Sequence, residues 1–481
     1  MAESTKSSSS SDWFDADLIA EKPSRLSGFV FFLLCMILVF SGIAYGAVDL
    51  WALALLTVFA VLIVIFWMAD TWVKKGFQFN PNWLQLPLLG LLLIGLVQLL
   101  PLGSVSVPDK LFTSASPIAS LSLDPYSTRF GIMQLSIYLI FFAAALTFIN
   151  NQKRLRKIVF TIIIFGAIMG FFGILQRLAN PDAIYGLRPT PQADPFASFV
   201  NKHHFAAFME MTIALTLALL FGKATKKDKN ILLIIAIVLM GIAIVFTGSR
   251  GGLLSLLGVL GFVITANLLH RKEEEADAET VGNYRRNFAL IGGGITLILV
   301  LFGSAFLLGG DSALLRGVGL QQSENMDVSS GRLHFWQVAL KIILDNPILG
   351  AGLNSFGVAF TRYDTWNGGL RVEQAHNDYL QTLADTGILG FACIAVFIYL
   401  LFRQGLQIIG KATDNFRRNT AIGALAGCFG ILIHSFFDFP LRTPSNSFFF
   451  LTFTVLATAS INYPKLYRKK REKRRKSRDE E

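Results

Sequence analysis

The chain has 481 residues, of which 53% are hydrophobic and only 16% charged, and its formal net charge is +11. Soluble domains carry about a quarter of charged residues, so this composition excludes an ordinary soluble protein. The three cysteines, Cys35, Cys393 and Cys428, all lie inside apolar runs, which argues against a disulfide framework and against a zinc cluster.

The first 27 residues are polar and serine-rich, and they lack the apolar core and small-residue cleavage site of a secretory signal. We expect residues 1–27 to form a disordered cytoplasmic tail before an uncleaved first span. The apolar runs that follow are each long enough to cross a bilayer, and they predict an all-α, polytopic integral membrane protein with about 12 transmembrane helices. The expected spans cover residues 28–48, 51–69, 83–101, 129–149, 157–176, 204–222, 231–247, 252–270, 288–309, 387–404, 418–436 and 446–462.

This pattern divides the chain into five parts. After the tail, residues 28–309 should hold the first nine spans, and residues 310–386 a large loop that is too long to be a mere connector. Residues 387–462 should hold the last three spans, and residues 463–481 a basic cytoplasmic tail. We expect short amphipathic helices in the large loop.

Lysine and arginine residues alternate between the predicted loops, and the positive-inside rule then places both termini in the cytoplasm. The outward segments, residues 101–128, 177–203, 248–251, 310–386 and 435–445, are poor in basic residues but hold most of the polar clusters. Much of the excess charge lies in Tyr467–Arg478, directly after the last predicted span, where it fits anionic lipid headgroups rather than nucleic acid.

Arg250 lies in the turn FTGSRGG between two apolar spans, with glycines on both sides. The glycines leave room for backbone amides and the guanidinium to approach one ligand, and arginine binds phosphate oxygens bidentately. An arginine that reaches lipid headgroups is the structural alternative. We interpret Arg250 as a phosphate ligand.

Arg332 opens the stretch SGRLHFWQVALKIILDNP, whose apolar residues recur at helical spacing. We expect an amphipathic helix on the outer membrane surface, capped by Ser329 or Ser330 and ended near Pro347. A cation near a helix start opposes the helix dipole, and an anionic ligand would resolve that conflict. His334, in the same helix, is interpreted as structural.

His376 begins the motif HNDYLQTLADTGILG. If Asn377–Thr386 forms a short helix that ends at Gly387, His376 lies at its N-terminal end, where the dipole favours a neutral imidazole. A neutral imidazole can accept a proton from a sugar hydroxyl, as a general base must. Asn377 is a candidate supporting residue beside it.

Two further polar clusters lie at outer ends of predicted spans. FVNKHHFA supplies Asn201 and His204, and FFDFPLRTPSN supplies Asp438 and Arg442. The adjacent histidines of the first motif point in different directions on a helix and make a poor metal site. Asp438 and Arg442 are either a structural ion pair or groups that help to seat a polar substrate.

Together these motifs resemble the O-antigen ligase and O-antigen polymerase superfamily of bacterial membrane glycosyltransferases. The resemblance rests on FVNKHHFA, TGSRGG, SGRLHFW followed by NPILGAGLNSF, HNDYLQTLADTGILG and FFDFPLRTPSN, in the family's order, over roughly residues 185–450. It implies a GT-C-like membrane enzyme in the bacterial inner membrane, with its active site facing the periplasm.

The resemblance also implies the reaction. A glycan passes from an undecaprenyl-pyrophosphate carrier to an acceptor hydroxyl, without nucleotide, metal or other cofactor, and with inversion at the anomeric centre. Arg250 and Arg332 fall on the arginines proposed to hold the pyrophosphate, and His376 on the proposed base. The residues that vary among relatives, Lys202 and His203, receive no catalytic role.

The acceptor is left open by the sequence. Lipid A core would make the protein a ligase in lipopolysaccharide biosynthesis, and a second lipid-linked glycan would make it a polymerase of O-antigen or exopolysaccharide. A protein hydroxyl, as in an O-oligosaccharyltransferase, is a third possibility. A transporter or flippase of lipid-linked sugars is the alternative from another class, although the candidate residues cluster at outer ends rather than at the membrane midplane.

Overall fold

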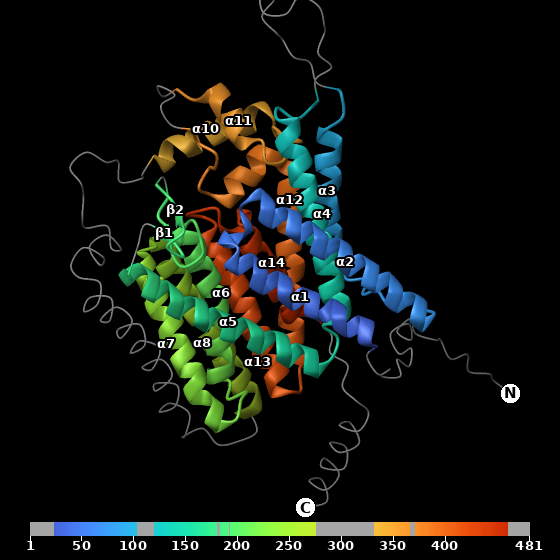
Figure 1. The fold of residues 1–481 in the computed structure, drawn as a ribbon, viewed down its shortest axis with the longest axis vertical. Coiled ribbons are helices and arrows are strands. Elements are labelled where there is room, and N and C mark those ends of the chain that lie inside the picture. Colours follow the sequence, from blue (N-terminus) through green and yellow to red (C-terminus); the bar gives the residue numbers. More distant parts are fainter. Residues whose placement is uncertain are drawn as a thin grey trace, which may run out of the picture.

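The computed structural model describes residues 24–102, 120–179, 183–191, 193–275, 331–365 and 371–459. These residues form a bundle of helices with one small two-stranded hairpin (Figure 1). The elements are α1 (Arg25–Ile43), η2 (Tyr45–Ala47), α2 (Leu50–Lys74), α3 (Gln85–Gln98), α4 (Pro125–Phe148), α5 (Gln152–Ala179), β1 (Ala183–Ile184), β2 (Arg188–Pro189), α6 (Lys202–Phe221), α7 (Lys227–Thr247), α8 (Arg250–Glu275), α10 (Arg332–Asp345), α11 (Phe356–Tyr363), α12 (Asp378–Lys411), α13 (Asn415–His434), η3 (Pro440–Arg442) and α14 (Pro444–Thr458).

Eight of the described helices are long and apolar enough to cross a membrane, namely α1, α2, α4, α5, α6, α7, α8 and α12. The prediction of a helical, multi-pass membrane protein is therefore confirmed. The expected count of about 12 spans is not confirmed. Helices α3 and α14 have only 14 and 15 residues, α13 has 20 residues but is not among the eight, and the expected span 288–309 lies outside the described residues. The two predicted tails also lie almost entirely outside them.

The helices α6, α13 and α14 form the centre of the bundle. Every residue of α14 is buried, and α6 is buried from His204 to Leu219. Glycines let α13 approach α6 closely: a methyl group at Gly423 would lie 2.7 Å from the Cα of Leu215, and one at Gly427 would lie 3.1 Å from the Cα of Met211. Small residues commonly allow such backbone contact between membrane helices.

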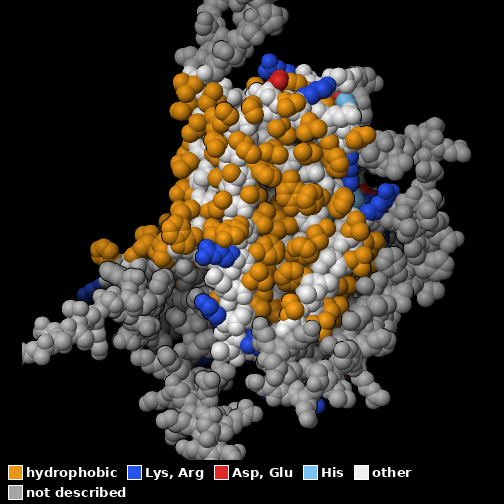
Figure 2. All heavy atoms as spheres, turned by 180° about the vertical axis from the view of Figure 1, so that it is seen from behind, with side chains coloured by type: hydrophobic (Ala, Val, Ile, Leu, Met, Phe, Trp, Pro, Cys, Tyr) orange, Lys and Arg blue, Asp and Glu red, His pale blue; other side chains and the backbone are white. Residues whose placement is uncertain are grey.

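The outer helices present apolar side chains to their surroundings. Leu55, Val58 and Ile65 of α2 are all more than 40% exposed, and Figure 2 shows apolar side chains spread over most of one face of the bundle, with basic side chains toward its edges. Water would not tolerate an apolar surface of this extent, whereas lipid chains cover it without cost.

Polar contacts between loops fall into two sets at opposite ends of the bundle. At the end that carries α10 and α11 in Figure 1, which we call the site end, the Gln98 side chain donates to the carbonyls of Leu349 and Asp385. At the other end, Asn82 bonds to Gln404 and Gln152 to Asp414. The outward segments predicted at 177–203, 248–251 and 435–445 meet at the site end, so the predicted alternation of loops agrees with these contacts.

Helix α12 is broken where the sequence predicts the end of a short helix. Gly387 adopts φ 62° and ψ −166°, a conformation that is essentially restricted to glycine. Residues 346–352 lie against the break, where the Ile388 amide donates to Pro347 and the Ala351 amide to Ala384. A methyl group at Gly387 would come within 2.3 Å of the Ile348 carbonyl oxygen, so glycine permits this junction between the large loop and the membrane helix.

The amphipathic helix α10 ends at Asp345 as expected, but the expected serine cap at its start is wrong. The N-cap is Gly331, with φ 80°. Glycine takes this left-handed conformation without steric cost, whereas serine would be strained there. His334 of α10 bonds to Asp364 at 2.8 Å and contacts the ring of Phe360, which agrees with a structural role.

Candidate functional site

The site forms around the segment that joins α13 to α14, residues 435–442, which we call the DFPLR segment. Three neighbours hold it in place. The Asp378 amide donates to the carbonyl of Ser435, the Asn377 side chain donates to that of Phe436, and the Asn446 side chain donates to that of Pro440. The segment therefore brings its own polar side chains against the start of α12 and the start of α6.

His376 and Asp438 form the centre of the site. The Nδ1 atom of His376 lies 3.1 Å from Oδ1 of Asp438, and Nη2 of Arg332 lies 3.8 Å from Oδ2 of the same carboxylate. The side chains of His376 and Arg332 are 30% and 29% exposed, whereas Asp438 is 1% exposed. The buried carboxylate of Asp438 thus contacts two partly exposed side chains, the imidazole of His376 and the guanidinium of Arg332, which come from different parts of the chain.

Asp438 is ionised in this environment. Burial by itself raises the pKa of the carboxyl, but the hydrogen bond from His376 holds that pKa well below its usual range. An ionised carboxylate can only accept, and Oδ1 also accepts from the Phe439 amide. Nδ1 of His376 must then carry a proton, which leaves Nε2 as the proton acceptor.

Aromatic rings fix the orientation of His376. Its ring meets the edge of Phe439 at a centroid distance of 4.8 Å and stacks on Phe335 of α10 at 6.0 Å. Its backbone is left-handed, with φ 51°. Such backbone conformations are uncommon outside glycine, and they persist where surrounding structure determines them.

Three of the other predicted residues have structural partners. Asn201 caps α6 and accepts from the His203 amide, and Asn377 caps α12 and accepts from the amides of Tyr379 and Leu380. His204 is buried, and its Nδ1 atom lies 2.6 Å from the Thr443 hydroxyl. Phe439 lies between the rings of His204 and His376, so His204 packs against the aromatic ring that contacts His376.

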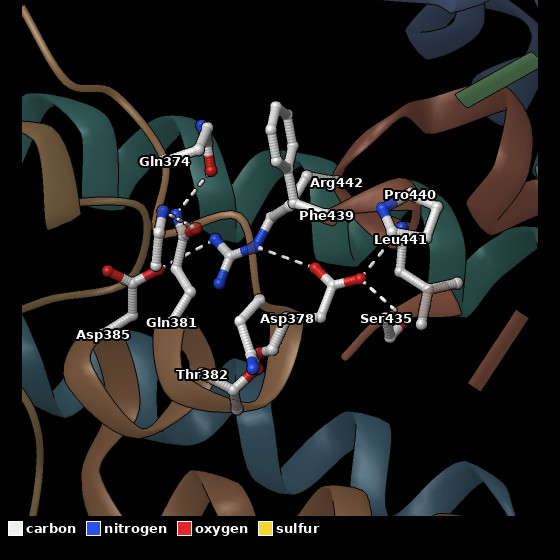
Figure 3. A network of polar contacts seen from close by, with 12 residues as sticks. Gln374, Asp378, Gln381, Thr382, Asp385, Ser435, Phe439, Pro440, Leu441 and Arg442 are labelled. Carbon is white, nitrogen blue, oxygen red and sulfur yellow. Dashed lines mark hydrogen bonds and ion pairs between the residues drawn. The ribbon is translucent and has the colours of Figure 1, made fainter. Parts of the chain in front are cut away.

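Arg442 lies in a network with two carboxylates (Figure 3). Its Nη1 atom is 2.8 Å from Asp385 and 2.9 Å from the side-chain oxygen of Asn354, and its Nε atom is 3.9 Å from Asp378. Asp378 also accepts from the Ser435 hydroxyl and the Leu441 amide. Arg442 therefore joins the DFPLR segment to α12 and to the large loop, and it does not pair with Asp438 as one reading of the sequence suggested.

Arg250 is the first residue of α8, and its side chain is exposed. The turn before it is bonded to α6, because the Ser249 hydroxyl lies 2.8 Å from Nδ1 of His203. A methyl group at Gly251 would lie 3.0 Å from the ring of His434, which ends α13. Within the part of the chain that the structure describes, Arg250 makes no ion pair, and it lies near the site rather than in contact with Arg332 or His376.

Four buried partners in this region were not predicted. They are Glu210 and His434, which bond to each other at 2.9 Å inside the bundle, and Asp378 and Asp385, which bind Arg442. Charged residues inside apolar helices are the signal that could have identified them, since they require partners. No group of three or more metal-ligating side chains occurs among the described residues.

Residues 235–395 match the family described as O-antigen ligase. The match includes Arg250, Arg332 and His376, whereas Asp438 and Arg442 follow it in the chain. No curated protein matches this sequence.

Proposed function

We propose that this member of the O-antigen ligase and polymerase superfamily transfers a glycan from an undecaprenyl-pyrophosphate carrier to an acceptor hydroxyl on the periplasmic face of the bacterial inner membrane. The observation that carries the proposal is the convergence of His376, Asp438 and Arg332 at one end of the bundle. These groups come from the large loop and the DFPLR segment, which are far apart in the sequence, and together they supply a base, its orienting carboxylate and a cation.

In the proposed reaction, Nε2 of His376 removes the proton of the acceptor hydroxyl. The acceptor oxygen forms a bond to the anomeric carbon while the bond from that carbon to the pyrophosphate oxygen breaks. Asp438 holds the imidazole in the required tautomer and stabilises the imidazolium that forms. One displacement of this kind inverts the anomeric centre.

The leaving group accumulates negative charge as its bond breaks. Arg332 contacts Asp438 at ion-pair distance rather than hydrogen-bond distance, so its guanidinium can also donate to a phosphate oxygen. Arg250 is exposed nearby, at the start of α8. Two guanidinium groups at the pyrophosphate would favour the transition state, because charge develops there.

Transfer by the purified full-length protein tests the proposal. The protein, a labelled lipid-pyrophosphate glycan and candidate acceptors are combined, and covalent transfer is measured. We expect His376→Ala to lower turnover by roughly 10²–10⁴-fold, the usual effect of losing a general base, with donor binding retained. His334→Ala is the matched control, since His334 belongs to a different histidine–carboxylate pair, with Asp364.

Wild-type protein that moves the lipid-linked glycan across a membrane without transferring it would establish the flippase alternative. In a deletion strain, finished polymer that remains on the carrier indicates a ligase, whereas loss of all long polymer indicates a polymerase.

A further inference from the structure

A cavity of about 360 Å³ lies between α3, α4, α12 and α14. The DFPLR segment borders both this cavity and the proposed active site, but different residues of the segment line each of them. Ser435, Leu441 and Arg442 line the cavity, whereas Asp438 and Phe439 contact His376. The cavity and the active site are therefore neighbours separated by one stretch of chain.

The cavity runs from a polar end to an apolar end. Near Arg442 its wall carries the amides of Gln134, Asn354 and Gln374, and farther along the helices it carries Leu91, Phe397 and Leu451. Phe397 lies ten residues beyond the break at Gly387, or roughly 15 Å along α12. That length is half of a hydrocarbon core of about 30 Å.

The guanidinium at the polar end is already paired. Arg442 is the one basic residue among the described lining residues, and it is paired with Asp385 and Asp378. A phosphate placed there would meet two carboxylates against one guanidinium. The cavity thus suits an apolar chain that is joined to its head by an uncharged group. The region of Arg250 and Arg332, by contrast, suits a phosphate.

We propose that this cavity holds one hydrocarbon chain of the acceptor lipid, which makes the acceptor membrane-borne. The inference rests on the proposed function, because that function assigns the donor pyrophosphate to Arg332 and Arg250, neither of which lines this cavity. The cavity between α3, α4, α12 and α14, whose guanidinium is already paired, is then available to the second lipid. An acceptor held there has its head beside the DFPLR segment, next to His376.

Photolabelling tests the cavity without any transfer reaction. The probe is a long-chain alkyl glucoside with a diazirine in the middle of its chain, added to the full-length protein in nanodiscs. We expect labelled peptides that contain Ile394, Phe397 or Leu451. Ile394→Trp should reduce labelling at least about tenfold, because burial of two methylene groups is worth that factor.

Val396→Trp is the matched control, since Val396 lies two residues away on α12 and is 48% exposed. It should leave labelling unchanged, and both variants should keep the wild-type melting temperature within a few degrees. Labelling that Ile394→Trp does not reduce, or that maps to other helices, would overturn the proposal. Stronger labelling by the same chain on a phosphate head would contradict the charge argument.

Kinetics then identify the lipid. With the acceptor that the wild-type protein uses, Ile394→Trp should raise the acceptor KM about tenfold and leave the donor KM unchanged. A chemically deacylated form of that acceptor should show the same KM with both proteins. A raised donor KM instead would assign the cavity to the donor chain. If the wild-type protein transfers nothing yet is labelled in the cavity, the proposed function fails while a lipid site in the cavity stands.

Discussion

At the scale of single residues, Asp438 decides what His376 can do. Its carboxylate is buried, accepts from Nδ1 of His376, and is itself held by the Phe439 amide. The imidazole of a free histidine has two interchangeable tautomers, and the carboxylate selects the one with an unprotonated Nε2. Asp438 is therefore a positioning residue in the proposed mechanism.

We expect Asp438→Asn to lower turnover at least about 10²-fold while donor affinity is retained, because an asparagine amide can donate to Nδ1 and so favours the wrong tautomer. Asp364→Asn is the matched control, since it alters another histidine–carboxylate pair, that of His334 and Asp364. Turnover and donor binding are measured on the same preparations. Equal losses in both variants would mean that the effect is structural.

Asp438 should also make stability depend on pH. Because its pKa is depressed in the folded protein, its ionised form stabilises that state above the unfolded value of about 3.9, and this contribution is lost as pH falls through the folded value. Above pH 5 the melting temperature of the wild-type protein should exceed that of Asp438→Asn. The difference should shrink only at lower pH. A difference that shrinks between pH 8 and pH 6 would refute the assignment.

The two arginines should be sensitive to conservative replacement. Arg250→Lys and Arg332→Lys preserve charge but lose the planar fork that binds phosphate oxygens bidentately. We expect each to retain only a small remnant of transfer and each alanine variant to retain none. Near-wild-type transfer by Arg250→Lys, at normal expression, would rule out phosphate binding through this side chain.

At the scale of elements, the break in α12 links the large loop to the membrane helices. Residues 346–352 bond to the backbone on both sides of Gly387, and Arg442 forms an ion pair with Asp385, two residues before the break. The start of α12 is thereby held by both the large loop and the DFPLR segment. His376 lies two residues before this start.

Gly387→Ala should destabilise the protein by about 1–3 kcal/mol or more, because its φ and ψ are strained for any other residue and the added methyl group meets the Ile348 carbonyl. The melting temperature in detergent measures this. Gly410→Ala is the control on the same helix, where nothing lies within 4 Å of the added methyl group. That variant should be neutral or slightly stabilising.

At the scale of the whole molecule, the contacts at the two ends of the bundle determine which loops share a side. Leu187 is 81% exposed at the site end, and Thr413 is exposed at the opposite end. In a variant without native cysteines, we expect Leu187→Cys to react with an impermeant reagent in intact cells and Thr413→Cys to react only after lysis. The reverse result would place the proposed active site in the cytoplasm.

The sequence by itself determined the helical membrane architecture, because apolar runs of sufficient length cannot remain in water and must satisfy their backbone groups internally. It also located the end of α10 near Pro347 and the break at Gly387, since these depend on the local conformational preferences of proline and glycine. The motifs that resemble the O-antigen ligase superfamily were recognisable for the same reason: each is a continuous stretch of chain.

Only the tertiary structure decided which polar residues meet. The sequence left Asp438 and Arg442 as one candidate pair, yet Asp438 bonds to His376 and Arg442 to Asp385. It gave no sign that Glu210 and His434 are partners, 224 positions apart. These pairings depend on how helices from distant parts of the chain pack, because a buried charge takes whichever partner the packing brings within reach, and no local pattern encodes that choice.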